Sequence, residues 1–371
     1  MKHLENNKVL TKCQHSFRSK RSCETQLIGL IQDLISTMDS KMQTDMIVLD
    51  FAKTFDKVSH PRLLHKLKYY GIKGKNNQWN TAFLESRTQA VVLENRYSDK
   101  VDVTPGVPQG SVLGPVPFLI YINDITDNMQ STIRLFADDC TIYRPINNKN
   151  DQQILQSDLT NLTKWEPKRK MAFNDSKCNV MHLTRSKNPI KEPYYIHGKQ
   201  LEVVQDTKYL GITVNDDLIW NLHINNIVSS ANQVQGMLSR NIKKAPQQTK
   251  ITATNTLVRP RVEYSAAIWD PYTQENIDKI ERVQRRAARY VYNDYRNDSS
   301  VTDMLNRLNW KPLQERRLDI RICLFYTIVN RLVVVPTENY LVPQLRPSRH
   351  YNSMVYTIFS PSISTHSFPE P

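Results

Sequence analysis

Glycine, paired cysteines and long apolar runs are all scarce in this sequence. Only 9 of its 371 residues are glycine, which excludes a glycine-rich fibrous protein or linker. No stretch approaches the roughly 18 consecutive apolar residues that a membrane-spanning helix requires. The first residues, MKHLENNKVLTKC, contain no apolar signal core. We therefore expect an intracellular protein, in the nucleus, the cytoplasm or both, that does not insert into a membrane.

The cysteines and the loop motifs exclude further classes of protein. The five cysteines are scattered and include no Cys-x-x-Cys pair. Their odd number argues against a disulfide framework, and their spacing gives no complete set of zinc-finger ligands. The chain also lacks the Gly-x-x-x-x-Gly-Lys-Ser/Thr phosphate loop, which disfavours an ordinary ATPase.

Positive charge is what the sequence has in excess. It contains 50 Lys and Arg against 36 Asp and Glu, a formal net charge of +14. Such a balance favours a polyanionic partner, nucleic acid before an anionic membrane, with an ordinary basic soluble protein as the alternative. Four arginines are spaced i, i+3, i+4 and i+7, so they share one face of a predicted helix: Arg282, Arg285, Arg286 and Arg289. Such a stripe would suit the phosphates of a duplex. The alternative is a charged face that is merely solvated.

Apolar periodicity divides the chain into two parts. Short strand-like and helical segments are mixed over residues 46–214, which is typical of an α+β domain. We expect strands at 45–50, 179–185 and 208–214, a hairpin over 132–144, and helices at 24–38, 59–71, 111–125 and 152–165. From 215 to 335 the pattern is helical, including one segment over 247–269, and 336–371 is expected to be a loose tail.

Three aspartates stand at the ends of predicted strands. Asp50 closes the apolar run DMIVLD, and Asp138 and Asp139 lie between TIRLF and CTIYR, the arms of the predicted hairpin. If the strand and the hairpin are neighbours, the three carboxylates converge and repel unless cations lie among them. Oxygen ligands favour Mg²⁺, and two such ions about 3.5–4 Å apart bind the attacking and leaving oxygens of a phosphoryl transfer. Taken singly, these residues are better explained as a helix cap at Asp50 and a tight turn at Asp138-Asp139.

Five ordered segments resemble the palm motifs of reverse transcriptases. They are LDFAKTFDKVSH, GVPQGSVLGPVPFLIYINDI, RLFADDCTIYR, KWEPKRKMAFNDSKCNVMHLTR and KYLGITV. QHSFRSKRSCETQL resembles the segment before the palm, and RVQRRAARYVYN resembles the C-terminal region. The resemblance is to LINE-type, non-LTR retrotransposon enzymes of the jockey and CR1 kind, and it covers about residues 4–335.

The resemblance implies an RNA-directed DNA polymerase with a right-hand architecture. Residues 1–45 would be partial fingers, 46–214 a palm with an antiparallel sheet and packed helices, and 215–335 an all-helical thumb and C-terminal region. An RNA template, a DNA primer and dNTPs would be the partners, and two Mg²⁺ ions the cofactors, with Mn²⁺ as the alternative metal.

The same resemblance assigns roles to individual residues. The catalytic residues would be Asp50, Asp138, Asp139 and Lys177, and the metal ligands the three aspartates with the Phe51 carbonyl. The nucleotide-binding residues would be Arg18, Phe55, Gln109, Gly110 and Ala137. Phe55 would exclude a ribose 2′-OH, with a core aromatic as the alternative, and Lys177 would be a general acid, with an exposed structural lysine as the alternative. Tyr209, Leu210 and Gly211 would form the primer grip.

The sequence also departs from this family. An upstream fingers region with an Arg-Pro-Ile strand and a basic triphosphate clamp is missing, as are the endonuclease and a zinc knuckle. Ser16 stands where the family usually has Gly, and Pro117 falls inside a predicted helix, where proline costs about 3 kcal/mol. These features indicate a truncated copy or a gene model that starts late. The alternative function is therefore a catalytically inactive fragment that only binds nucleic acid.

Overall fold

The computed structural model describes residues 1–335, 341–343 and 356–358. They fall into two compact units. The first unit contains Met1–Gln26 and Gln32–Gln205, and the second contains Leu27–Ile31 and the described residues that follow Gln205. The structure thus groups residues 206–214 with the helices that follow, whereas the sequence analysis extends the palm to residue 214.

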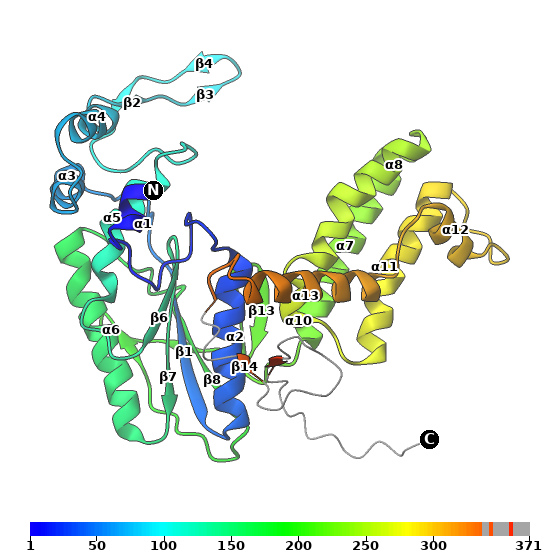
Figure 1. Cartoon of the computed structure of the whole chain (residues 1–371). Coiled ribbons are helices and arrows are strands. Elements are labelled where there is room, and N and C mark those ends of the chain that lie inside the picture. The colour runs from blue at the N-terminus through cyan, green and yellow to red at the C-terminus, as the bar shows by residue number, and fades with distance from the viewer. Residues whose placement is uncertain (336–340, 344–355, 359–371) are drawn as a thin grey trace. The chain divides into compact units, whose positions relative to one another are not determined.

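A five-stranded sheet with the order β11–β8–β1–β7–β6 organises the first unit (Figure 1). Its strands are β1 (Gln43–Leu49), β6 (Thr132–Phe136), β7 (Asp139–Ile146), β8 (Asn179–Leu183) and β11 (Glu202–Val203). β1 runs antiparallel to both β7 and β8, β6 is antiparallel to β7, and β11 is parallel to β8. The predicted α+β class is confirmed, and the predicted hairpin lies directly beside the strand that ends at Asp50.

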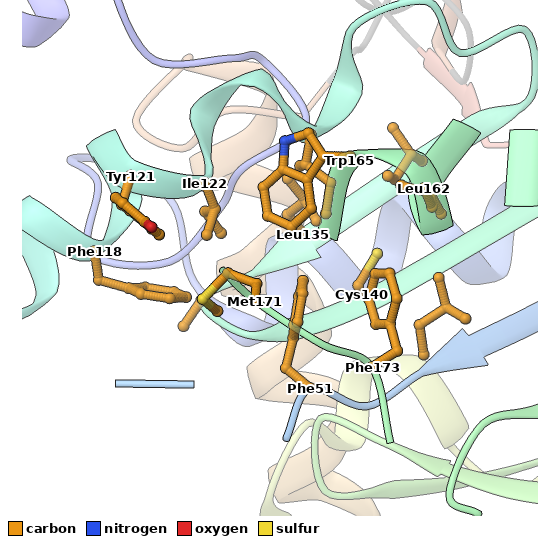
Figure 2. Close-up of a cluster of buried hydrophobic side chains, with 14 of the residues drawn as sticks. Phe51, Phe118, Tyr121, Ile122, Leu135, Cys140, Leu162, Trp165, Met171 and Phe173 are labelled. Atoms are coloured by element: carbon orange, nitrogen blue, oxygen red, sulfur yellow. The ribbon is translucent and has the colours of Figure 1, made fainter. Parts of the chain in front are cut away.

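Helices cover both faces of this sheet because its side chains alternate in direction. On one face of the sheet, side chains of the strands form a buried hydrophobic cluster with residues of α5 (Pro115–Ile122) and α6 (Lys149–Arg169). Figure 2 shows part of this cluster, including Phe51, Leu135, Cys140, Trp165 and Phe173. On the other face, Asp33 of α2 (Cys23–Asp39) accepts hydrogen bonds from Arg134 and Tyr143.

The helix that contains Pro117 is shorter than predicted. The helix predicted over 111–125 begins only at Pro115, so Pro117 lies in its first turn. A proline there loses no intrahelical hydrogen bond, because the first-turn N–H groups have no partner in the helix. The expected cost of an interior proline is therefore avoided.

Shorter elements complete the first unit. They are α1 (Lys2–Asn6), α3 (His60–Tyr69), α4 (Gly74–Leu84), η1 (Asn123–Thr126), and the strand pairs β2 (Thr88–Gln89) with β5 (Val101–Asp102), β3 (Val92–Leu93) with β4 (Arg96–Tyr97), and β9 (Tyr195–Ile196) with β10 (Lys199–Gln200). Glu94 and Asn95 form the turn between β3 and β4, with φ values of 48° and 61°.

The second unit begins with a hairpin and continues with helices. The hairpin is β12 (Asp206–Tyr209) and β13 (Ile212–Asn215), and the helices are α7 (Asn221–Asn241), α8 (Gln247–Ala253), α9 (Arg259–Glu263), α10 (Ala266–Trp269), α11 (Gln274–Tyr292), α12 (Val301–Arg307) and α13 (Leu313–Val329). The single helix expected over 247–269 is wrong. A π-helical turn, η2 (Thr254–Val258), precedes Pro260, and Ser265 at φ 50° separates α9 from α10.

The expected loose tail, 336–371, lies largely outside the described residues. Within it the structure describes β14 (Leu341–Pro343) and β15 (Tyr356–Ile358), which pair antiparallel.

Candidate active site

Strand register brings the three aspartates to the same end of the sheet. Leu49, the last residue of β1, pairs with Cys140 of β7, so Asp50 follows and Asp139 precedes this pair. Asp139 in turn pairs with Phe136 across the β6–β7 turn, which contains Ala137 and Asp138. The convergence that the sequence analysis expected is therefore present in the first unit.

Electrostatic repulsion is evident among these carboxylates. Burial, followed by the negative charges of Asp138 and Asp50, raises the pKa of Asp139 to about 6. Each nearby negative charge makes it harder to ionise Asp139. A bound cation would relieve this repulsion, which is the electrostatic condition that a metal site requires.

Two neighbours contact the aspartates directly. The Lys177 Nζ lies 3.4 Å from Asp50 Oδ2, and the lysine side chain is 65% exposed. The buried Thr54 donates its hydroxyl hydrogen to Asp138 Oδ2 at 3.1 Å. Lys177 thus lies beside Asp50, and its role stays a prediction. Thr54 was missed because a lone threonine after a strand carries no distinctive pattern.

Gln14 holds the turn that carries Asp138. Its Oε1 accepts hydrogen bonds from the backbone N–H groups of Ala137 and Ser16, both at 3.0 Å, and its Nε2 donates to the Ala137 carbonyl at 3.3 Å. Ala137 has φ 53°, a left-handed conformation that a non-glycine residue seldom adopts. Gln14 is 2% exposed. This residue was also missed, since its partner lies far away in the sequence and no local pattern marks it.

Backbone hydrogen bonds also join the segment around Gln14 to β6. The segment at Gln14 forms a parallel bridge to Leu135 of β6. The His15 N–H donates to the Leu135 carbonyl at 2.9 Å, and the Leu135 N–H donates to the Cys13 carbonyl at 3.0 Å. The N-terminal segment therefore covers the edge of β6 beside the carboxylates.

The two phenylalanines after Asp50 pack inside the unit. Phe51 is buried and stacks on Phe173 with ring centroids 4.4 Å apart. The backbone hydrogen bonds that flank this pair use the carbonyls of Asp50 and Ala172 rather than that of Phe51. Phe55 is half-buried and packs on Phe118 with centroids 4.6 Å apart. Phe55 is thus held firmly but keeps an accessible surface.

The loop with Gln109 and Gly110 is exposed, and Gly106 anchors it. Gly106 has φ +95°, and an added Cβ would lie 3.0 Å from the Asp56 Cα and carbonyl oxygen. The Gly106 N–H donates to the Val58 carbonyl at 2.8 Å. Only glycine fits this approach without strain, so the loop is fixed against the segment that follows Asp50.

Arg18, expected to bind nucleotide, is engaged within the protein. Its guanidinium donates to both carboxylate oxygens of Glu5 at 3.0 Å and to the Thr11 carbonyl at 2.7 Å. The Arg18 side chain is only 7% exposed. Its contacts in the structure stabilise the N-terminal segment around Gln14.

The expected primer grip lies in the second unit. Tyr209 is buried, and Leu210 and Gly211 form the β12–β13 turn with φ 45° and 85°. The Tyr264 hydroxyl donates to the Leu210 carbonyl at 2.9 Å, and its ring lies against Gly211. The turn is therefore supported by Tyr264, the residue that follows α9.

The arginine stripe of α11 is present, but its members differ in accessibility. Arg282, Arg285 and Arg286 are exposed, whereas Arg289 is half-buried. Arg289 Nη1 donates to the Arg296 carbonyl at 2.8 Å, which ties it to the loop after α11. Three of the four arginines thus present a cationic surface.

Within residues 1–335 and the two short strands beyond them, no group of three or more His, Cys, Asp or Glu side chains is arranged as a metal site. Catalytic Mg²⁺ is usually bound through one or two carboxylates with waters and substrate phosphates, so a protein-only cage is not required. The repulsion at Asp139 fits such a partial site.

Comparison with known proteins identifies the class. The family described as reverse transcriptase (RNA-dependent DNA polymerase) matches residues 1–214, more than half of the chain. The chain therefore belongs to the reverse transcriptase family. In the described residues, no helix is long and apolar enough to cross a membrane.

Its relatives include the polymerases of jockey-like, non-LTR retrotransposons. The chain is 26% identical over 305 residues to the probable RNA-directed DNA polymerase from transposon X-element of Drosophila melanogaster, covering 78% of this chain and 32% of the relative. It is 26% identical over 308 residues to the RNA-directed DNA polymerase from mobile element jockey of the same species, covering 76% and 32%. The chain spans about a third of the length of these curated relatives.

Solved structures with a similar backbone include apo telomerase from Candida tropicalis. That match has a TM-score of 0.46 and 10% identity, and it covers 79% of this chain and 48% of the telomerase chain.

Proposed function

We propose that this chain is an RNA-directed DNA polymerase domain that adds dNTPs to a primer 3′-OH on an RNA template. The observation that carries the proposal is the register of β1 with the β6–β7 hairpin, which gathers Asp50, Asp138 and Asp139. Family membership supplies the reaction class, and the +14 charge suits a nucleic acid substrate.

Asp50, Asp138 and Asp139 would hold the divalent ions, for which Mg²⁺ is the proposed metal. When bound, the metal supplies Lewis-acid stabilisation of the attacking and leaving oxygens. The protein's own contribution is to fix the carboxylates: Thr54 orients Asp138 by its hydrogen bond, and Gln14 holds the preceding turn. Lys177, exposed beside Asp50, would give a proton to the leaving pyrophosphate.

Primer extension on an RNA template with Mg²⁺ tests the proposal. Asp138→Asn keeps the side-chain volume but removes one charge, so we expect it to abolish synthesis. Asp127→Asn is the matched control, because it removes the same charge from an exposed aspartate of the same unit. Binding of an RNA–DNA duplex is measured in parallel and should be retained by both variants.

The results separate two functions. Synthesis that is lost only in Asp138→Asn supports the polymerase. Duplex binding without synthesis in the unaltered chain, even at high dNTP, would refute the polymerase and support the nucleic-acid-binding fragment.

A further inference from the structure

A tight turn between α6 and β8 carries Lys177. The Asn174 carbonyl accepts hydrogen bonds from the N–H groups of Lys177 at 2.9 Å and Cys178 at 3.1 Å. We call residues 174–178 the Lys177 turn. The Asn174 N–H donates to the Asp50 carbonyl at 2.7 Å, and Lys177 Nζ lies 3.4 Å from Asp50 Oδ2. The position of this turn therefore limits where the Lys177 amine can lie relative to the Asp50 carboxylate.

A side chain of the β9–β10 hairpin contacts the Lys177 turn. Lys199 Nζ of β10 lies 2.5 Å from Oδ2 of Asp175, a residue of the turn. The lysine side chain is 72% exposed, and the aspartate side chain is 25% exposed. Exposed ion pairs add little to the stability of a fold. This pair can therefore restrain the turn without being needed for folding.

A second side chain of the same hairpin supports the chain just before the turn. His197 Nε2 lies 2.6 Å from Glu166 Oε2, and Glu166 Oε1 accepts a hydrogen bond from the Phe173 N–H at 2.5 Å. Glu166 is 4% exposed, so both of its oxygens have partners inside the unit. Phe173 immediately precedes Asn174. The hairpin thus acts on the turn directly and on the residue that leads into it.

The hairpin is itself anchored by burial. His197 and Gly198 form its two-residue turn with φ values of 53° and 75°, a turn that joins antiparallel strands tightly. Ile196 and Leu201 on either side are buried in the hydrophobic cluster of the first unit. This burial keeps the turn end of the hairpin in place independently of the exposed Tyr195 at its open end.

We propose that the β9–β10 hairpin positions the Lys177 turn beside Asp50, with Lys199 as a positioning residue that acts through Asp175. The inference rests on the proposed function for the part that Lys177 plays in the reaction. It goes beyond that function by giving Lys199 and Asp175 an effect on the rate of synthesis.

Removing the Lys199 charge tests the proposal. Lys199→Gln should lower the rate of single-turnover primer extension by about fivefold, the most by which an exposed ion pair shifts a local equilibrium. Lys199→Arg keeps the charge and should keep the rate. Lys149→Gln is the matched control, because it breaks another exposed ion pair of the same unit, with Glu192 at 2.7 Å. It should leave the rate unchanged, and the melting curves of the two Gln variants should coincide.

A double-mutant cycle identifies the route of the effect. Lys177→Ala removes the group that Lys199 would position, so adding Lys199→Gln to it should cause no further loss of rate. If the two losses multiply instead, Lys199 acts independently of Lys177 and the proposal is wrong. It is equally wrong if Lys199→Gln extends primers as fast as Lys149→Gln.

Hydrogen exchange reports on the turn without requiring synthesis. The N–H groups of Lys177 and Cys178 should exchange about fivefold faster in Lys199→Gln and at the unaltered rate in Lys149→Gln, as measured by NMR. Faster exchange in a chain that extends no primers would refute the polymerase but support the action of the hairpin on the turn. Unchanged exchange in a chain that does extend primers would refute the hairpin's action and leave the polymerase standing.

Discussion

Replacing Gln14 by methionine tests whether the N-terminal segment positions the aspartates. Methionine preserves the shape but removes the contacts with the Ser16 N–H and with both backbone groups of Ala137. Leaving a buried backbone group unsatisfied costs about 1–3 kcal/mol. With partial relaxation of the turn, we expect the free energy of unfolding of the first unit to fall by about 2–4 kcal/mol.

The effect on synthesis should exceed the effect on stability. Ala137 holds a left-handed conformation next to Asp138, so the released turn can relax and displace the carboxylate. A displacement of about 1 Å in a reacting group costs about 100-fold in rate. Primer extension is therefore expected to fall roughly 100-fold at a temperature where circular dichroism shows the variant to be folded.

Gln156 offers a matched control for this experiment. Like Gln14, it hydrogen-bonds both backbone groups of one residue: its side-chain oxygen accepts from the Tyr195 N–H at 2.8 Å, and its side-chain nitrogen donates to the Tyr195 carbonyl at 3.0 Å. Tyr195 belongs to β9 and is exposed, so Gln156→Met should cost less than about 1 kcal/mol and leave synthesis intact. If Gln14→Met is folded and extends primers within twofold of the unaltered chain, the positioning role is refuted.

Three further substitutions address stability. The fully buried Asp45 accepts hydrogen bonds from Gln43, His182 and Tyr194, so Asp45→Ala should lower the free energy of unfolding by about 3–5 kcal/mol in urea titrations; an unchanged midpoint would contradict this. Burial lowers the pKa of His223 to about 4. The folded state therefore favours the neutral imidazole. Its stabilising contribution is complete above the unfolded pKa of about 6.5 and is lost as the pH falls toward 4, and the loss reaches about 2 kcal/mol at pH 5. His223→Asn should lack this pH-dependent loss. If its free energy of unfolding depended on pH in the same way as that of the unaltered chain, the role of His223 would be refuted. Gly106→Ala should cost about 1–3 kcal/mol because of its positive φ and its contact with Asp56, and thermal melting checks this.

Sequence patterns predicted the central part of the first unit well. Short runs rich in apolar and β-branched residues located β1, β6, β7 and β8, and the charged ends of these runs located the three aspartates. These signals are local, since a buried strand and a tight hairpin depend mainly on neighbouring residues.

Contacts between distant segments were not predictable in this way. Gln14 and Thr54 show no periodicity that distinguishes them from other polar residues, although both contact the turn of Asp138. Arg18 was assigned to nucleotide by resemblance, and only the structure shows its bidentate pairing with Glu5. In the second unit, apolar periodicity continued through 247–269, but Pro260 and the left-handed Ser265 divide this segment.

The bridge from Gln14 to Leu135 has a consequence for the order of folding. The segment at Gln14 is synthesised before its partner strand, which follows more than a hundred residues later. Contacts of such large sequence separation form slowly, because a long loop must close before they are gained. Until the N-terminal segment docks, the edge of β6 exposes unpaired backbone groups that can pair with another chain. Substitutions that weaken this docking should therefore promote aggregation during synthesis, even where the finished protein would be stable.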